Sequence, residues 1–131
     1  MVVNNAGTGS PGDVIHTSDD GWSRVVQTNL DAVFYGCRAA MPHLVASGGC
    51  IVNVTSVSGL GGDWANVAYN AAKGGVVNVT RALAMVHAGD AVRVNAMAPS
   101  LTRTDMSAGI TGNDLPVDGG LGASNGQPRL S

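Results

Sequence analysis

The chain has 131 residues, of which 44% are hydrophobic and 12% charged, and its formal net charge is −2. This composition is too apolar for a disordered chain and offers no basic surface for nucleic acid. No apolar run reaches the ~18 residues that a membrane span needs, and the polar pair Asn4 and Asn5 argues against a secretory leader. We therefore expect a cytoplasmic protein of about one domain that binds neither nucleic acid nor membrane.

The cysteines and histidines do not indicate a metal site. Cys37 and Cys50 form no CxxC pair, and the three histidines have no spacing typical of metal ligands. We expect two reduced, packed cysteines and no bound metal.

The first predicted elements are a strand and a long helix. A short apolar strand at residues 1–3 leads into a turn-rich segment. Thr17 is predicted to cap the helix, with Asp20 as its capping-box partner. Apolar residues then recur at helical spacing from Trp22 to Leu44, and Gly48 is expected to end the helix.

The rest of the chain again alternates predicted strands with a predicted helix. The β-branched run at 50–55 is typical of a strand buried on both faces, and a second helix fits residues 67–87. A third strand is expected at 91–97, a candidate short strand lies around 115–117, and the tail at 122–131 has the composition of a disordered segment. Strands that alternate with long helices predict an α/β fold with a parallel sheet.

Three glycines near the start match a phosphate-binding pattern. Gly7, Gly9 and Gly12 form GxGxxG after the first strand. In a dinucleotide-binding fold the third glycine lies in the first turn of a helix, but residues 12–16 have no helical period. The acidic residue that should follow the next strand is also missing, because Asp31 falls inside the predicted helix. We interpret the segment as a strand-to-loop exit that uses glycine for tight turns.

Tyr69 and Lys73 form the most informative pair. At an i, i+4 spacing both side chains lie on one helix face. A free tyrosine has a pKa of about 10 and is a poor acid or base at neutral pH, whereas a neighbouring ammonium favours the phenolate and lowers that pKa. Two polar residues that share a solvated face by chance are the alternative interpretation of this spacing.

The motifs taken together resemble the short-chain dehydrogenase/reductase family. In chain order, the matching segments are Asn4-Asn5-Ala6-Gly7, Asn29, Val52 to Ser56, Tyr69 with Lys73, Val92 to Pro99, and Asn113 to Gly120. The resemblance implies an α/β, partial Rossmann-like, doubly wound parallel sheet with three main strands, a short last strand and two long helices. It also implies an oxidoreductase that uses NAD or NADP on an alcohol or ketone, and a homo-oligomer formed through the two long helices.

The resemblance assigns a role to each matching residue. Tyr69 matches the general acid/base, and Lys73 matches the residue that binds the nicotinamide ribose and lowers the tyrosine pKa. Ser56 matches the serine that stabilises the substrate oxygen, with Ser58 as the runner-up. Asn29 matches the helix asparagine whose main chain holds a proton-relay water. The remaining cofactor-binding matches are Asn5, Ala6, Gly7, Pro99, Thr102 and Thr104.

The sequence also departs from the family pattern. The family begins with a strand, a glycine-rich TGxxxGxG turn and a helix, which this chain does not contain. Pro99 is followed by Ser100 instead of glycine, and only residues 107–112 stand where the family has a substrate lid and another helix. We expect a partial catalytic domain at 1–121 with an internal deletion near 107–112. Two interpretations stay open: an enzyme of the family, or a non-catalytic fragment or pairing module.

Overall fold

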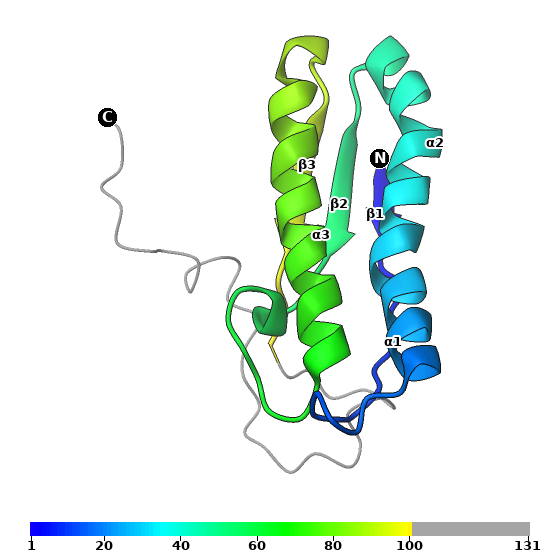
Figure 1. Ribbon diagram of the computed structural model, residues 1–131. Helices are drawn as coiled ribbons and strands as arrows, with labels where there is room; N and C mark the ends of the chain where they lie inside the picture. Colours follow the sequence, from blue (N-terminus) through cyan, green and yellow to red (C-terminus); the bar gives the residue numbers. More distant parts are fainter. Residues whose placement is uncertain (101–131) are drawn as a thin grey trace, which may run out of the picture. The chain divides into compact units, whose positions relative to one another are not determined.

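The computed structural model describes residues 1–100 of the chain. The chain divides into two compact units, Met1–Ala98 and Pro99–Ser131, and the first contains all the described helices and strands (Figure 1). The candidate strand around 115–117, the proposed deletion near 107–112 and the tail at 122–131 lie outside the described residues, so these expectations stay predictions.

The first unit is built on a parallel sheet, as predicted. Strands β1 (Val2–Asn4), β2 (Cys50–Val54) and β3 (Arg93–Met97) are hydrogen-bonded in the order β1-β2-β3. The register pairs Val3 with Val52 and Val52 with Asn95. Because all three strands run in the same direction, their carboxyl ends meet at one edge of the sheet, where the loops after β1 and β2 leave it.

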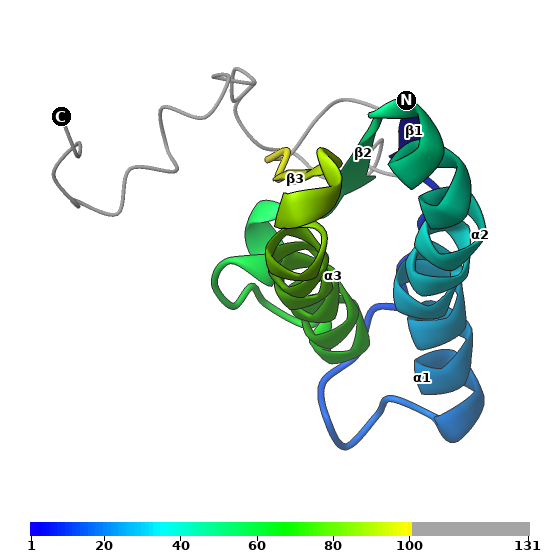
Figure 2. The same cartoon turned by 90° about the horizontal axis from the view of Figure 1, so that it is seen from above.

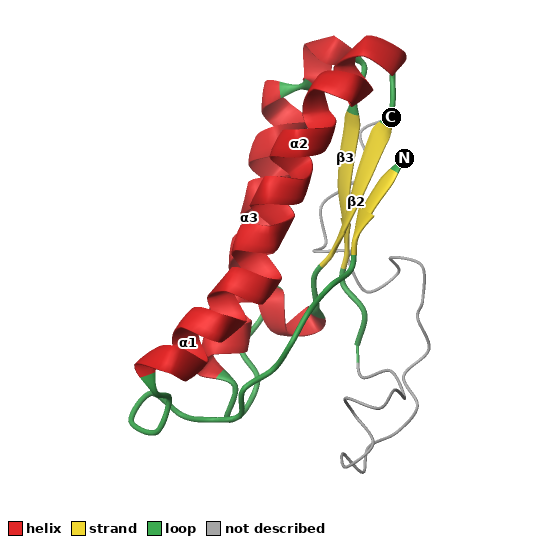
Figure 3. Cartoon of the chain, turned by 90° about the vertical axis from the view of Figure 1, so that its right-hand side faces the viewer, coloured by secondary structure: helices red, strands yellow, loops and turns green. Residues whose placement is uncertain are grey.

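Two long helical segments cover one face of this sheet (Figures 2 and 3). The first segment is continuous from α1 (Asp19–Val26) through a π-helical stretch (Gln27–Asp31) into α2 (Ala32–Ser47). The second is α3 (Val67–Val86), which begins where the sequence predicts. The α/β, Rossmann-like arrangement is therefore confirmed, and no helix within residues 1–100 is long and apolar enough to cross a membrane.

The start of the first helix differs from the prediction, whereas its end agrees. Ser18, and not Thr17, is the N-cap: the Ser18 hydroxyl accepts a hydrogen bond from the Gly21 amide at 3.1 Å. The Thr17 hydroxyl instead donates to the Asp13 carbonyl at 2.6 Å, which closes the preceding turn. Gly48 ends α2 in the left-handed conformation at φ 66°, which glycine adopts without steric cost.

The core lies between the sheet and the helices. Its buried apolar residues come from α2, β2, α3 and β3 with the residue before it: Val33, Cys37, Met41, Leu44, Ile51, Val76, Val92 and Val94. Both cysteines are free, as expected. One polar group crosses this core, because the buried Asn53 amide accepts from Asn4 at 2.8 Å and donates to Thr80 at 2.9 Å. These bonds satisfy the amide and connect β1, β2 and α3.

Candidate active site

The candidate residues gather at the carboxyl edge of the sheet. Gly7 follows β1, Ser56 follows β2, Asn29 lies in the π-helical stretch, and Tyr69 and Lys73 lie in the first two turns of α3. These residues come from segments far apart in the sequence. The parallel topology brings them together because the connections after β1 and β2 both start at this edge.

Asn29 ties the first long helix to the loop after β1. Its side chain is fully buried, and its amide donates to the Thr8 carbonyl and to the Val25 carbonyl at 2.8 Å each. The Thr8 amide donates back to the Asn29 carboxamide oxygen at 3.3 Å. A Cβ added at Gly7 would lie 2.9 Å from that oxygen and 3.5 Å from Lys73 Nζ. Glycine is therefore needed at position 7 for the loop to lie against both side chains.

The helix is widened where it carries Asn29. The Ala32 amide donates to the Gln27 carbonyl, five residues earlier, which is the π-helical pattern. Single π turns inside α-helices occur frequently at functional sites. The sequence prediction of one regular helix missed this feature.

Lys73 is a buried lysine. Its side chain is 3% exposed, and Nζ donates to the Val54 carbonyl at the end of β2 at 2.8 Å. Nζ also lies 5.5 Å from the centre of the Tyr69 ring. Burial lowers the pKa of Lys73 below 10.5 because the charged form loses its hydration.

Tyr69 is partly buried one helical turn before Lys73, beside Ser56. Burial raises the pKa of Tyr69 above 10.0, a hydrogen bond with Ser56 lowers it, and the charge of Asp63 raises it. The net shift is upward. The three causes of this shift do not include Lys73, so the expectation that Lys73 lowers the pKa of this tyrosine stays a prediction.

A polar cluster that the sequence analysis missed lies beside Ser56. Ser56 caps the 3-10 turn Val57–Gly59 and donates from its hydroxyl to Ser58 Oγ at 3.2 Å. Ser58 in turn donates to the carboxylate of Asp63, which Asn70 of α3 also contacts. Asp63 follows two glycines and precedes residues without helix or strand periodicity, so no sequence pattern indicated it as a site residue. Ser58, the alternative to Ser56 in the sequence analysis, is 7% exposed, and its hydroxyl donates to Asp63 and not to Tyr69.

Gly12 has a structural role and does not open a phosphate-binding helix. Its amide donates to the Ala65 carbonyl at 2.8 Å, and its carbonyl accepts from the Val67 amide at 3.3 Å. This parallel bridge joins the loop after β1 to the segment that starts α3. Ala65 has a φ of 53°, a conformation that costs energy for a residue with a Cβ.

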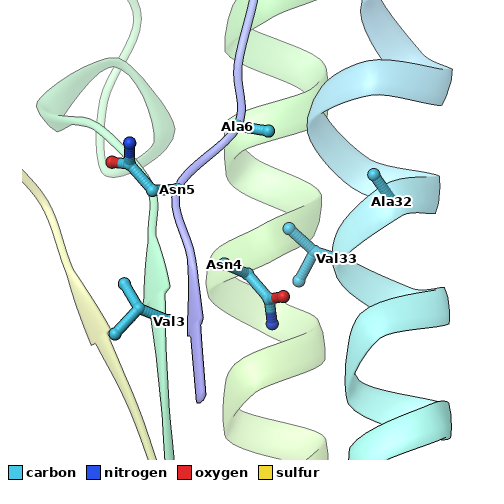
Figure 4. A pocket seen from close by; sticks show the side chains of 6 residues that line it. All are labelled: Val3, Asn4, Asn5, Ala6, Ala32 and Val33. Atoms are coloured by element: carbon cyan, nitrogen blue, oxygen red, sulfur yellow. The ribbon is translucent and has the colours of Figure 1, made fainter.

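Asn5 and Ala6 lie beside a hollow of about 270 Å³ between β1 and α2 (Figure 4). Figure 4 shows the alternation of the strand: Asn4 and Ala6 point toward α2, and Asn5 points to the opposite side. Of the other predicted cofactor residues, Pro99 begins the second unit, and Thr102 and Thr104 lie outside the described residues.

The residues around Lys73 fit a ligand that carries hydroxyl groups. An ammonium has three donors, and the acceptor recorded for Nζ within residues 1–100 is the Val54 carbonyl. A ribose supplies hydroxyl oxygens that can accept hydrogen bonds from such donors. Among the described residues, no group of His, Cys, Asp or Glu is arranged to hold a metal ion.

Comparison with known proteins identifies the family. The family model for short chain dehydrogenases matches residues 1–114. The chain is 40% identical to meso-2,3-butanediol dehydrogenase of Serratia marcescens, over 99% of this chain and 67% of that enzyme. It is 37% identical to the 3-oxoacyl-[acyl-carrier-protein] reductase of Chlamydia muridarum, over 86% of this chain and 46% of that enzyme.

Solved structures agree with this relationship. A 4-hydroxyisoleucine dehydrogenase complexed with NADH has a TM-score of 0.75 and 36% identity, over 79% of this chain and 47% of that one. A putative gluconate dehydrogenase from Agrobacterium tumefaciens has a TM-score of 0.79 and 34% identity, over 82% of this chain and 43% of that one. The chain belongs to the short-chain dehydrogenase/reductase family. It spans about half the length of most of these relatives.

Proposed function

We propose that this chain carries the acid/base machinery of an oxidoreductase that interconverts an alcohol and a ketone with NAD or NADP. The observation that carries the proposal is the grouping of Tyr69, Ser56 and Lys73 at one edge of the sheet, with Gly7 packed against both Lys73 and Asn29. The named dehydrogenases and reductases among the relatives, and the NADH complex of one of them, support it.

A nicotinamide cofactor, when bound, would supply or accept the hydride, and residues of this chain would transfer the proton. Tyr69 gives its hydroxyl proton to the substrate oxygen during reduction and takes one back during oxidation. Ser56 stabilises the charge that develops on that oxygen. Lys73 would bind the ribose hydroxyls, and Asn29 fixes the loop after β1 through its hydrogen bonds with Thr8. Asn5, Ala6, Pro99, Thr102 and Thr104 complete the proposed cofactor contacts.

A second candidate is a non-catalytic fragment or a module that pairs with another chain. Its support is the coverage of the relatives, which is 46% for the Chlamydia enzyme. The alignment to the Serratia enzyme extends over 168 residues, more than the 131 of this chain, which supports the proposed internal deletion. The exposed Phe34 and Tyr35, with Arg38 stacked on both rings, fit the proposed oligomer surface on the long helices.

A thermal melt with and without NADH or NADPH separates the two candidates. The enzyme proposal expects a cooperative melt that rises with one of the cofactors, because a ligand that binds the folded state stabilises it. The rise should be smaller in Lys73→Ala, while Tyr69→Phe should keep the rise and lose turnover. A cooperative melt that neither cofactor moves supports the non-catalytic candidate instead.

A further inference from the structure

Asp63 is an exposed carboxylate held between the two segments that carry Ser56 and Tyr69. Its backbone amide donates to the Asn70 carboxamide oxygen at 2.9 Å, and the Asn70 amide group donates back to one carboxylate oxygen. The Ser58 hydroxyl donates to the other carboxylate oxygen. Asn70 follows Tyr69 on α3, and Ser58 lies two residues after Ser56. These bonds fix the carboxylate beside the residues proposed to act on the substrate.

Asp63 keeps part of its capacity to accept hydrogen bonds. A carboxylate offers about four lone-pair sites, and Ser58 and Asn70 each occupy one of them. Both donors are neutral, and Asp63 forms no ion pair with a basic residue within residues 1–100. Its negative charge therefore has no direct cationic partner in the described part of the chain, and a small ligand with a hydroxyl or ammonium group can donate to it.

The charge of Asp63 reaches the phenol of Tyr69. Burial raises the pKa of Tyr69, and the nearby carboxylate raises it further because a phenolate and a carboxylate repel each other. The loop at 57–66 contains no lysine, arginine or histidine to offset this charge. Lys73 lies 5.5 Å from the Tyr69 ring, but its ammonium is buried and donates to the Val54 carbonyl. A substrate whose oxygen lies at Tyr69 therefore lies in the field of Asp63.

We propose that Asp63 determines the substrate class of this site: it accepts a hydrogen bond from a hydroxyl or ammonium group of the substrate and repels substrates that carry a carboxylate. This inference rests on the proposed function, because it takes Tyr69 as the residue that meets the reacting carbonyl. A hydroxyl that donates to a carboxylate forms a charge-assisted bond, which is stronger than one between neutral groups. The site then favours hydroxy ketones and the corresponding diols over keto acids and plain ketones.

Saturation-transfer NMR on the full chain without cofactor tests this selectivity, since nothing turns over. Three ketones of equal length serve as probes: hydroxyacetone, acetone, which lacks the hydroxyl, and pyruvate, which carries a carboxylate. We expect hydroxyacetone to bind about fivefold more tightly than acetone, because of its bond to a charged acceptor, and about tenfold more tightly than pyruvate, because of repulsion. Equal affinities, or no binding of hydroxyacetone, overturn the proposal.

The variant Asp63→Asn shows whether the carboxylate causes the preference. This isosteric change at an exposed position removes the charge and leaves an oxygen for one of the two donors. The discrimination between hydroxyacetone and pyruvate should fall from about tenfold to less than about twofold. The matched control Asp20→Asn removes an exposed carboxylate from α1, so it changes the net charge equally and should keep the wild-type ratio. If Asp63→Asn leaves the ratio unchanged, Asp63 only fastens its loop to α3, and the proposal is overturned.

If Asp63→Asn does not fold, the wild type alone decides. At about 1 M salt the screening length falls to about 3 Å, so the discrimination against pyruvate must weaken, and a constant ratio overturns the proposal. Turnover with NADH or NADPH is measured separately. A chain that discriminates between the probes but never turns over refutes the proposed oxidoreductase function and leaves the selectivity of Asp63 standing. An active chain without the discrimination refutes the selectivity alone.

Discussion

Replacing Gly59 by alanine should loosen the contact that places Ser56 against α3. A Cβ at this position would lie 2.6 Å from the carbonyl carbon and oxygen of Lys73 and 2.8 Å from Thr55 Oγ1. Thr55 cannot easily move away, because its hydroxyl donates to the same Lys73 carbonyl at 2.8 Å. Backbone atoms of a helix must therefore shift, and overpacking of this kind costs about 1–3 kcal/mol. At about 4 °C per kcal/mol for a chain of this size, the melting temperature should fall by roughly 4–12 °C.

The neighbouring Gly74 provides a control of opposite sign. A Cβ there would meet the Gly59 carbonyl oxygen at 3.7 Å, an ordinary contact, and the position lies inside α3. Glycine in a helix interior is less stable than alanine by about 0.5–1 kcal/mol, so Gly74→Ala should raise the melting temperature by roughly 2–4 °C. Circular dichroism melts of both variants give the comparison. A Gly59→Ala variant that melts with or above the wild type would refute the steric reasoning.

Three further predictions concern the buried polar groups and the loop. Burial lowers the pKa of Lys73, so the charged ammonium destabilises the folded state at every pH below that lowered pKa. This destabilisation decreases as the pH rises toward 10.5, because the folded protein then loses the proton first. Urea titrations should therefore show Lys73→Met to be more stable than the wild type at pH 7, with a smaller difference in stability at alkaline pH. Equal gains at both pH values would contradict this. Asn29→Ala removes bonds to Thr8 and Val25 and should cost about 2–3 kcal/mol in the same assay, and a loss below about 0.5 kcal/mol would show that the loop does not depend on them. Trp64 is 96% exposed, so Trp64→Ala should change the stability by less than about 0.5 kcal/mol; a larger loss would show that the indole packs on the fold.

The order of strands and helices could be predicted because the apolar patterns are strong. The run at 50–55 and the start of α3 at Val67 agree with the structure closely, as does the stop at Gly48. The N-cap was predicted one residue early, since Thr17 and Ser18 are both good caps and only the turn at Asp13 decides between them. Local propensity cannot resolve two adjacent caps.

The π-helical stretch is visible in the spacing of the buried residues. Buried residues on the first long helix fall at Val25, Asn29, Val33, Cys37, Met41 and Leu44, four apart as far as Met41 and three apart at the last step. In a regular α-helix a spacing of four drifts by about 40° per step, so such a run cannot keep one face buried without a wider turn. This spacing appears only once burial is known, because position 29 is a polar asparagine and other apolar residues lie between the buried ones.

The candidate site was predictable in part. The i, i+4 spacing of Tyr69 and Lys73 predicts a shared helix face, and both lie there. The pKa of Tyr69 was not predictable, because it depends on how deeply the ring is buried and on the carboxylate of Asp63. The direction of the hydroxyl hydrogens depends on contacts between a loop and a helix, which sequence spacing does not fix.

The bridge between Gly12 and the residues at 65–67 has a consequence for engineering. It joins two surface loops into one closed ring of backbone, and one of these loops starts the helix that carries Tyr69 two residues later. An exchange of loops with a related enzyme should therefore transfer the segment at 8–17 and the segment at 60–66 together. A graft of either loop alone would leave amides and carbonyls without hydrogen-bond partners at the start of α3. A shift of the helix at that point would also displace Tyr69 in the candidate site.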